Sequence, residues 1–282
     1  MRIVHFSDIH FGLWPERFWS ALLDKRVLGL VNYFLRRRGR MHRDYLERAL
    51  SLIETLDPQM VVCTGDVASI GSRREFKAAA RALDPLTQNP RRRFVYVPGN
   101  HDNYVRSRHC QRAFRETFAR LNGGRWQWSD LPLVETVGSL EFMVCDECRP
   151  TNIFLSSGFF SNRSAEVFRN WLARPRPAGR RRILIGHYPT RDQAGRPLSW
   201  RRRLNGGEIV RRALTEGLLD ASLCGHIHDP FCHREDNGAV EVCAGALTVK
   251  GKLNVLDLPA DGRSAIRQRW LSVDGQLEHE SG

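Results

Sequence analysis

Short apolar segments that end in metal-ligating or acid–base side chains recur along this chain. In the clearest case, the β-type residues 94–97 are followed by the turn Pro98-Gly99 and then by Asn100, His101 and Asp102. A hydrophobic core has little use for these three side chains, because each buried polar group needs its own partner. An amide oxygen can ligate a metal, an imidazole can transfer a proton, and a carboxylate can orient that imidazole. The stretch therefore favours a metal or phosphate site.

The same arrangement follows four other predicted strands. The strands cover residues 2–6, 60–63, 183–186 and 221–224, and the polar residues that follow them are Asp8 with His10, Asp66, His187, and His226 with His228. Glycine stands next to most of these residues and allows the backbone to bend and approach closely. Because ligands of open α/β sheets bind at the carboxyl ends of the strands, we expect these side chains to converge.

The order of the predicted elements indicates an α/β fold with mostly parallel or mixed sheets. Helices are predicted at 43–56, from the Ser72-x-x-Glu75 capping box onward, and at 107–121, 164–173 and 207–215. Two short strands between 133 and 144 are separated by Gly138-Ser139, and β-hairpin strands are predicted at 239–243, 246–250, 253–258 and 265–271. Without a repeat or a clear linker, residues 1–282 are predicted to form a single domain.

Composition limits the class of protein. The chain has 282 residues, of which 41% are hydrophobic, so it can bury a substantial core. It has no apolar run of about 20 residues and no signal-peptide pattern after Met1, so we expect a cytoplasmic protein. The seven cysteines are scattered, which favours reduced thiols, and the lone pair Cys145-x-x-Cys148 is weak evidence for zinc.

Residues 13–40 form a basic amphipathic insertion. Apolar side chains such as Trp14, Phe18, Trp19, Leu22 and Phe34 recur near helical spacing and are bordered by arginines. One interpretation is a helix or helical pair that packs on the body of the protein and exposes a basic face. The other is a segment that lies in a membrane interface or grips an acyl chain. The sequence leaves both interpretations open.

Taken together, the polar motifs resemble those of the calcineurin-like metallophosphoesterases. The matching motifs are Asp8-Ile9-His10, Gly65-Asp66, Gly99-Asn100-His101-Asp102, Gly186-His187 and Gly225-His226-Ile227-His228. The resemblance covers residues from about 2 to 250. It implies a four-layer α-β-β-α sandwich with two mixed β-sheets flanked by helices. It also implies two divalent metal ions, for which mixed nitrogen and oxygen ligands favour Mn, Fe or Zn.

The resemblance also implies a role for each motif residue. One metal would be held by Asp8, His10, Asp66 and His228, and the other by Asp66, Asn100, His187 and His226. A hydroxide bridging the metals would attack phosphorus in line, and the metals would neutralise charge on the phosphoryl oxygens. His101 would donate a proton to the leaving oxygen, with Asp102 as its orienting partner. The remaining histidines, His5, His42, His109, His233 and His279, are predicted to be structural or exposed.

The substrate is the least determined feature. The net charge of +13 indicates anionic partners. One subfamily resemblance is to UDP-2,3-diacylglucosamine pyrophosphate hydrolases, which residues 13–40 favour, together with peripheral contact with the inner face of an anionic membrane. The alternative is a soluble phosphodiesterase of 3′,5′-cyclic AMP, and the arginine-rich loop after His187 suits either phosphorylated substrate. A nuclease is the least favoured class, because the chain has no recognisable nucleic-acid-binding module.

Overall fold

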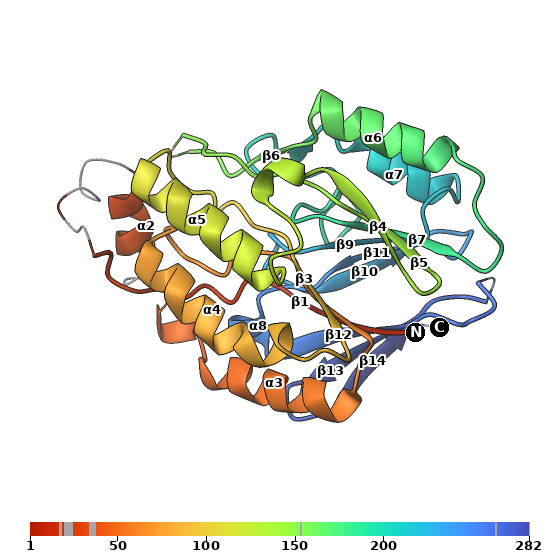
Figure 1. Ribbon diagram of the computed structural model, residues 1–282, viewed down its shortest axis with the longest axis horizontal. Helices are drawn as coiled ribbons and strands as arrows, with labels where there is room; N and C mark the ends of the chain where they lie inside the picture. Colours follow the sequence, from red (N-terminus) through yellow and green to blue (C-terminus); the bar gives the residue numbers. More distant parts are fainter. Residues whose placement is uncertain (17–18, 20–24, 34–37, 153, 263, 282) are drawn as a thin grey trace.

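The computed structural model describes residues 1–16, 19, 25–33, 38–152, 154–262 and 264–281. Within these residues, two six-stranded mixed sheets pack against each other and are flanked by helices on their outer sides (Figure 1). This arrangement confirms the predicted α/β class and the four-layer α-β-β-α sandwich.

The first sheet is built around three parallel strands. Its order is β14-β13-β12-β1-β2-β3. The parallel strands are β1 (Arg2–Phe6), β2 (Met60–Cys63) and β3 (Arg93–Tyr96), and the antiparallel ones are β12 (Lys252–Asp257), β13 (Arg267–Ser272) and β14 (Leu277–Ser281). Nearly every residue of β1 and β2 is buried, and β2 is accordingly apolar throughout, while β1 is apolar except for Arg2 and His5.

The second sheet repeats this plan. Its order is β10-β11-β9-β7-β5-β4. The parallel strands are β5 (Leu140–Val144), β7 (Arg181–Ile185), β9 (Ala221–Cys224) and β11 (Val240–Cys243), with β4 (Leu133–Val137) and β10 (Phe231–Arg234) antiparallel at the edges. A separate two-stranded parallel sheet joins β6 (Gly158–Phe159) to β8 (Leu204–Asn205).

Helices cover both outer faces. On the first sheet lie α3 (Asp44–Leu56), α4 (Arg73–Thr87) and α5 (Arg108–Leu121), and on the second lie α6 (Asn162–Ala173) and α7 (Glu208–Thr215) (Figure 1). The main core joins the two sheets, since Val4 and Val62 of the first and Phe142 and Ile183 of the second belong to one buried cluster. A second cluster, which includes Phe168 of α6, lies between the second sheet and its helices.

Most predicted elements are present, and the errors are local. The capping box begins α4 as expected, because Ser72 Oγ accepts from the Glu75 N–H and Glu75 accepts from the Ser72 N–H. The strand predicted at 246–250 is wrong: it is the short helix α8 (Leu247–Lys250), which ends at Gly251 with a φ of 60°. The β-branched residues there suggested a strand, but they follow the end of β11, where a compact turn is needed. The strands β6, β8, β10 and β14 were not predicted.

The described part of the insertion at 13–40 is partly packed on the body of the protein and partly exposed. Its described elements are α2 (Arg26–Asn32) and the 3₁₀ turn η2 (Arg38–Arg40). Arg26 and Tyr33 are buried, and a side chain at Gly12 would overlap with the Tyr33 ring, so part of the insertion packs on the body. Trp14 and Trp19 are exposed. The predictions for residues 17–18, 20–24 and 34–37, which include Phe18, Leu22 and Phe34, lie outside the described residues.

Candidate metal centre

The predicted ligands gather where the carboxyl ends of the parallel strands of both sheets meet. Asp8 and His10 follow β1, Asp66 follows β2 and Asn100 follows β3, while His187 follows β7, and His226 and His228 follow β9. The two sheets are joined directly at this edge, because Asp8 Oδ2 accepts the His226 N–H at 3.1 Å. The convergence expected from the strand pattern is therefore present.

The backbone at this edge is unusual. Among the described residues, five that are not glycine have a left-handed backbone, and four of them are predicted ligands: Asp8, His10, Asp66 and His226, with φ between 46° and 66°. This conformation costs of order 1–3 kcal/mol at each such residue and persists only where the surroundings impose it. Its concentration here marks the edge as a functional site.

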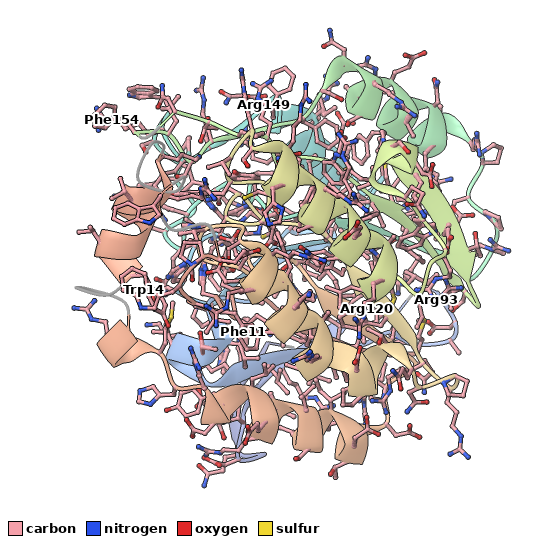
Figure 2. All side chains as sticks on the ribbon, turned by 60° about the vertical axis from the view of Figure 1, so that its left-hand side comes forward. Phe11, Trp14, Arg93, Arg120, Arg149 and Phe154 are labelled. Atoms are coloured by element: carbon pink, nitrogen blue, oxygen red, sulfur yellow. The ribbon has the colours of Figure 1, made fainter. Side chains whose placement is uncertain are left out.

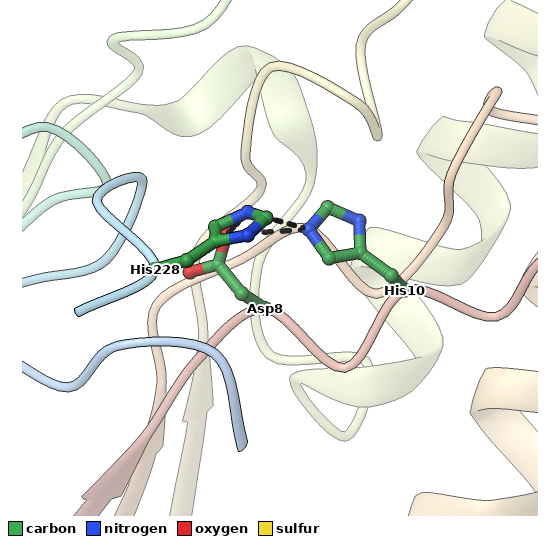
Figure 3. A group of neighbouring side chains, drawn as sticks. All are labelled: Asp8, His10 and His228. Carbon is green, nitrogen blue, oxygen red and sulfur yellow. Dashed lines mark hydrogen bonds and ion pairs between the residues drawn. The ribbon is translucent and has the colours of Figure 1, made fainter. Parts of the chain in front are cut away.

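The first group of ligands comprises Asp8, His10 and His228 (Figure 3). The Nε2 atoms of the two histidines lie 3.2 Å apart, and Asp8 Oδ1 lies 3.4 Å from His10 Nε2 and 3.5 Å from His228 Nε2. His10 Nδ1 donates to the Ala68 carbonyl at 3.2 Å, so Nε2 carries the lone pair. These three atoms surround a single point, as ligands of one cation do.

The second group comprises Asn100, His187 and His226. His187 Nε2 lies 3.3 Å from Asn100 Oδ1, which also lies 2.9 Å from His226 Nδ1. His187 Nδ1 donates to the Thr64 carbonyl at 2.6 Å, so Nε2 presents a lone pair toward another acceptor. His187 Nε2 and Asn100 Oδ1 are then two acceptor atoms close together, an arrangement that a cation between them would stabilise.

Asp66 lies between the two groups. Its Oδ2 is 3.9 Å from His10 Nε2 and 3.6 Å from His187 Nε2. The donor set fits two divalent cations, because nitrogen and carboxylate atoms converge in two adjoining places. In addition, Asp8 Oδ1 is buried with no hydrogen-bond partner within the described part of the chain. The residues expected at each metal from the family resemblance are thus brought together.

Electrostatics keep these ligands in the forms that bind metals. Burial lowers the pKa of His187 and of His226, so both imidazoles are neutral near pH 7. Burial alone would raise the pKa of Asp8, but the His10 imidazole beside it, together with the neighbouring His228 and His187, holds that pKa well below its usual range. Asp8 is therefore an anion when it meets a cation.

Glycines allow the ligands to approach the neighbouring backbone. A side chain at Gly99 would overlap with the Asp66 carboxylate, and one at Gly225 would overlap with Ser7 and with the Asp8 carboxylate. Both positions therefore require glycine, which explains its place next to the predicted ligands.

His101 lies beside the first group, with its ring centroid 5.1 Å from that of His10. Its Nδ1 donates to the Ser69 carbonyl at 2.6 Å, which leaves Nε2 as the nitrogen that exchanges a proton. The expected pairing with Asp102 differs from the observed contacts. The Asp102 carboxylate accepts from the Ala68 and Gly99 N–H groups and from the Tyr96 hydroxyl, so it braces the loop, and Ser69 orients the imidazole.

A further carboxylate was missed by the sequence analysis. Glu147 is buried, and its Oε2 accepts the N–H of His187 at 2.7 Å and that of Tyr188 at 2.9 Å. It follows the apolar strand β5, so it has the same position relative to its strand as the predicted ligands. A carboxylate soon after an apolar strand is therefore the sequence signal that could have identified Glu147. The nearby Cys145 and Cys148 are buried, and neither belongs to a group of potential metal ligands within the described residues.

The sequence also matches a known protein family. The sequence profile of the calcineurin-like phosphoesterases matches residues 1–230. The chain belongs to this family. It is therefore a metal-dependent phosphoric ester hydrolase of a dinuclear family, and its sheet edge carries two groups of side chains that could hold metal ions, Asp8 with His10 and His228, and Asp8 with Asp66 and His187. No curated protein matches the sequence.

Solved structures of the family share its fold. A purple acid phosphatase from yellow lupin (Lupinus luteus) seeds aligns with a TM-score of 0.60 and 13% identity over 99% of this chain and 53% of that one. A dimetal phosphatase from Danio rerio aligns with a TM-score of 0.56 and 16% identity over 96% and 95%. The calcineurin-like chain thus spans about half the length of the lupin phosphatase. These identities establish the fold alone.

Proposed function

We propose that this calcineurin-like phosphoesterase hydrolyses the pyrophosphate bond of a membrane lipid such as UDP-2,3-diacylglucosamine. It would work at the cytoplasmic surface of an anionic membrane. Two observations support the proposal: a largely apolar cavity whose wall residue Tyr104 stacks on His101, and exposed apolar side chains, of which Phe154 lines that cavity.

The cavity carries the proposal. Its volume is about 680 Å³, and its walls include Lys25, Tyr104, Val105, Pro150 and Phe154. The Tyr104 ring stacks on the His101 imidazole, with centroids 5.2 Å apart and ring planes within 10°. The cavity therefore adjoins the residue expected to protonate the leaving group, and its walls suit a leaving group with an apolar part.

The surface near the cavity suits a bilayer. Trp14 is 51% exposed, Trp19 79% and Phe154 72%, and Figure 2 shows Trp14 and Phe154 toward the same edge of the molecule. Large apolar side chains that are exposed to this extent are candidates for contact with the apolar part of a membrane. An adjoining groove along the start of α5 is lined by Glu116, which pairs with Arg112, and by a majority of basic residues, Arg106, Arg108, Arg112 and Arg115. Each basic residue near an anionic membrane contributes about 1 kcal/mol.

No helix within the described residues is long and apolar enough to cross a membrane. Binding by the exposed tryptophans and arginines would therefore be peripheral, in the manner of interfacial segments.

The chemistry follows from the placement of the side chains. Two divalent cations, of which Mn, Fe and Zn suit the ligands best, would polarise the phosphoryl oxygens and lower the pKa of a bound water. Asp66 would hold the two cations together. His101 would deliver its proton from Nε2 to the leaving oxygen, and the Ser69 carbonyl would hold the ring in the orientation that this transfer needs.

A competition experiment tests the proposal. The Mn²⁺-loaded protein receives UDP-2,3-diacylglucosamine and 3′,5′-cyclic AMP together in detergent micelles, and mass spectrometry identifies the products. We expect UMP and the lipid monophosphate. Formation of 5′-AMP alone would replace the proposal with a soluble phosphodiesterase, and formation of neither product with intact metal content would favour a nuclease.

The membrane contact is tested separately. Trp14→Ser and Phe154→Ser should weaken binding to vesicles that contain anionic phospholipid. Leu277→Ser is the matched control, because Leu277 is 56% exposed but lies on the edge strand β14. Equal binding of all three variants and the unmodified protein would contradict the membrane contact.

A further inference from the structure

The loop between β7 and β8 lines a cavity beside the segment that carries two of the predicted ligands. A cavity of about 520 Å³ is lined by this loop, including Arg196 and Arg202, and by Ile227. Ile227 stands between His226 and His228 in the chain, so one wall of the cavity adjoins the segment that carries these two predicted ligands. A substrate bound at the metals would extend past this wall.

The backbone that carries Arg202 is held in place on both sides. The carbonyl of Arg201 accepts the N–H of Ser156 at 2.9 Å, and the carbonyl of Arg203 accepts the N–H of Gly158 at 3.0 Å. The Arg202 N–H itself donates to the Ser199 carbonyl at 2.9 Å. Arg202 thus projects from a fixed segment and does not depend on a long, unsupported loop.

The charges of the loop distinguish Arg202 from its neighbours. The other arginines have partners: Arg191 pairs with Glu235 and Glu241, Arg196 pairs with Asp192, Arg201 lies over the Trp200 ring, and Arg203 donates to Asn205. Within the described residues, the exposed guanidinium of Arg202 has no ion pair or side-chain hydrogen bond.

We propose that Arg202 binds a second anionic group of the substrate, namely the phosphate adjacent to the one that is attacked. The guanidinium can grip two phosphate oxygens at once and stays charged at every physiological pH. The substrate class is then a phosphoanhydride with two neighbouring phosphates. A cyclic nucleotide has one phosphate and would leave this arginine without a ligand. The inference rests on the proposed function.

Binding to the metal-free protein tests the subsite without catalysis. Isothermal titration calorimetry would compare inorganic pyrophosphate with inorganic phosphate for the unmodified protein, for Arg202→Ala and for Arg201→Ala. The Arg201 variant removes the same charge from the neighbouring position. We expect Arg202→Ala to weaken pyrophosphate binding about tenfold or more, as loss of a charge-assisted contact does, and Arg201→Ala to leave it unchanged. Equal losses in the two variants would overturn the subsite.

Kinetics with the Mn²⁺-loaded enzyme separate this inference from the proposed function. UDP-N-acetylglucosamine serves as a pyrophosphate probe, UDP-2,3-diacylglucosamine as the proposed substrate and 4-nitrophenyl phosphate as a monoester. Arg202→Ala should raise KM about tenfold for each pyrophosphate that the enzyme hydrolyses, and in Arg202→Lys the rise in KM should be smaller. In both variants, kcat/KM for the monoester should stay within about twofold of the value for the unmodified enzyme. Turnover of the pyrophosphates with the same KM in Arg202→Ala would refute the subsite alone. Hydrolysis of the monoester but of neither pyrophosphate would refute both the subsite and the proposed function.

Discussion

Asp66 and His101 are tied together by a hydrogen bond from the His101 N–H to Asp66 Oδ1 of 2.7 Å. The other oxygen of this carboxylate faces the imidazoles of both ligand groups. The Asp66 side chain therefore links the candidate metal centre to the backbone of His101, the expected proton donor. A substitution at Asp66 should therefore affect both metal binding and the position of His101.

Asp66→Ala should abolish metal binding and activity together, because both ligand groups lose the carboxylate they share. Asp66→Asn keeps an oxygen for the His101 N–H but removes the charge, so it should retain the fold and still lose most of its metal. Metal content by mass spectrometry and turnover of 4-nitrophenyl phosphate check this. Asp57→Asn is the control, because Asp57 also has a left-handed backbone but caps α3. Full metal content in Asp66→Ala would contradict the bridging role.

His101→Ala should slow turnover of substrates with poor leaving groups by about 10²–10⁴-fold while both metals stay bound. A 4-nitrophenyl ester should be affected much less, because its leaving group needs little protonation. Initial rates on an alkyl and a 4-nitrophenyl phosphodiester, with metal content measured on the same samples, give the comparison. Unchanged turnover of the alkyl ester would remove His101 from the role of acid.

Much of this site could be predicted from the sequence, because its ligands stand directly after apolar strands. The geometry of parallel strands brings such residues to one edge whatever the details of packing. The partner of His101 could not be predicted in this way. Asp102 is next to His101 in the chain, yet the Ser69 carbonyl contacts the imidazole, and a backbone group carries no residue-type signal.

The fold shows the same distinction. Strands with uninterrupted apolar runs, such as β2, were predicted with their correct bounds. The helix α8 was not, because Thr248 and Val249 at its centre have strand propensity, whereas the segment is turned by its position between Gly245 and Gly251, both of which have positive φ. The short strands β6 and β8 have two residues each and show no periodicity.

Glu147→Ala should weaken metal binding in the second group without removing a ligand. The carboxylate fixes the backbone of His187, and loss of such a supporting group typically costs 10–100-fold in metal affinity. It should also lower the free energy of unfolding by about 1–3 kcal/mol, since two buried N–H groups lose their acceptor. Competition with a chelator and urea unfolding measure the two effects.

Asp146→Asn is the matched control for Glu147, because Asp146 is adjacent in the chain and contacts Ser164 of α6. It should leave the affinity for the metal unchanged. If Glu147→Ala lost stability but kept the metal affinity of the unmodified protein, Glu147 would serve the fold alone.

The lowered pKa of the buried His5 determines part of the pH dependence of the free energy of unfolding. His5 is fully buried beneath the centre, where it contacts Thr64 and Asn254, and burial lowers its pKa from 6.5 to about 3. The unfolded chain therefore takes up this proton first as the pH falls. The stability that His5 contributes is complete above pH 6.5 and is lost toward pH 3, by about 2 kcal/mol between pH 7 and pH 5.

Urea unfolding of the metal-free protein at pH 7 and pH 5 measures this loss. In His5→Gln the decline should be shallower by about 2 kcal/mol, because a neutral amide takes up no proton in either state. His279→Gln, at an exposed position of β14, should decline as the unmodified protein does. All three proteins keep the histidines of the metal centre, so the difference between their declines belongs to His5. Parallel declines would mean that the folded protein accepts the proton at His5 as readily as the unfolded chain does.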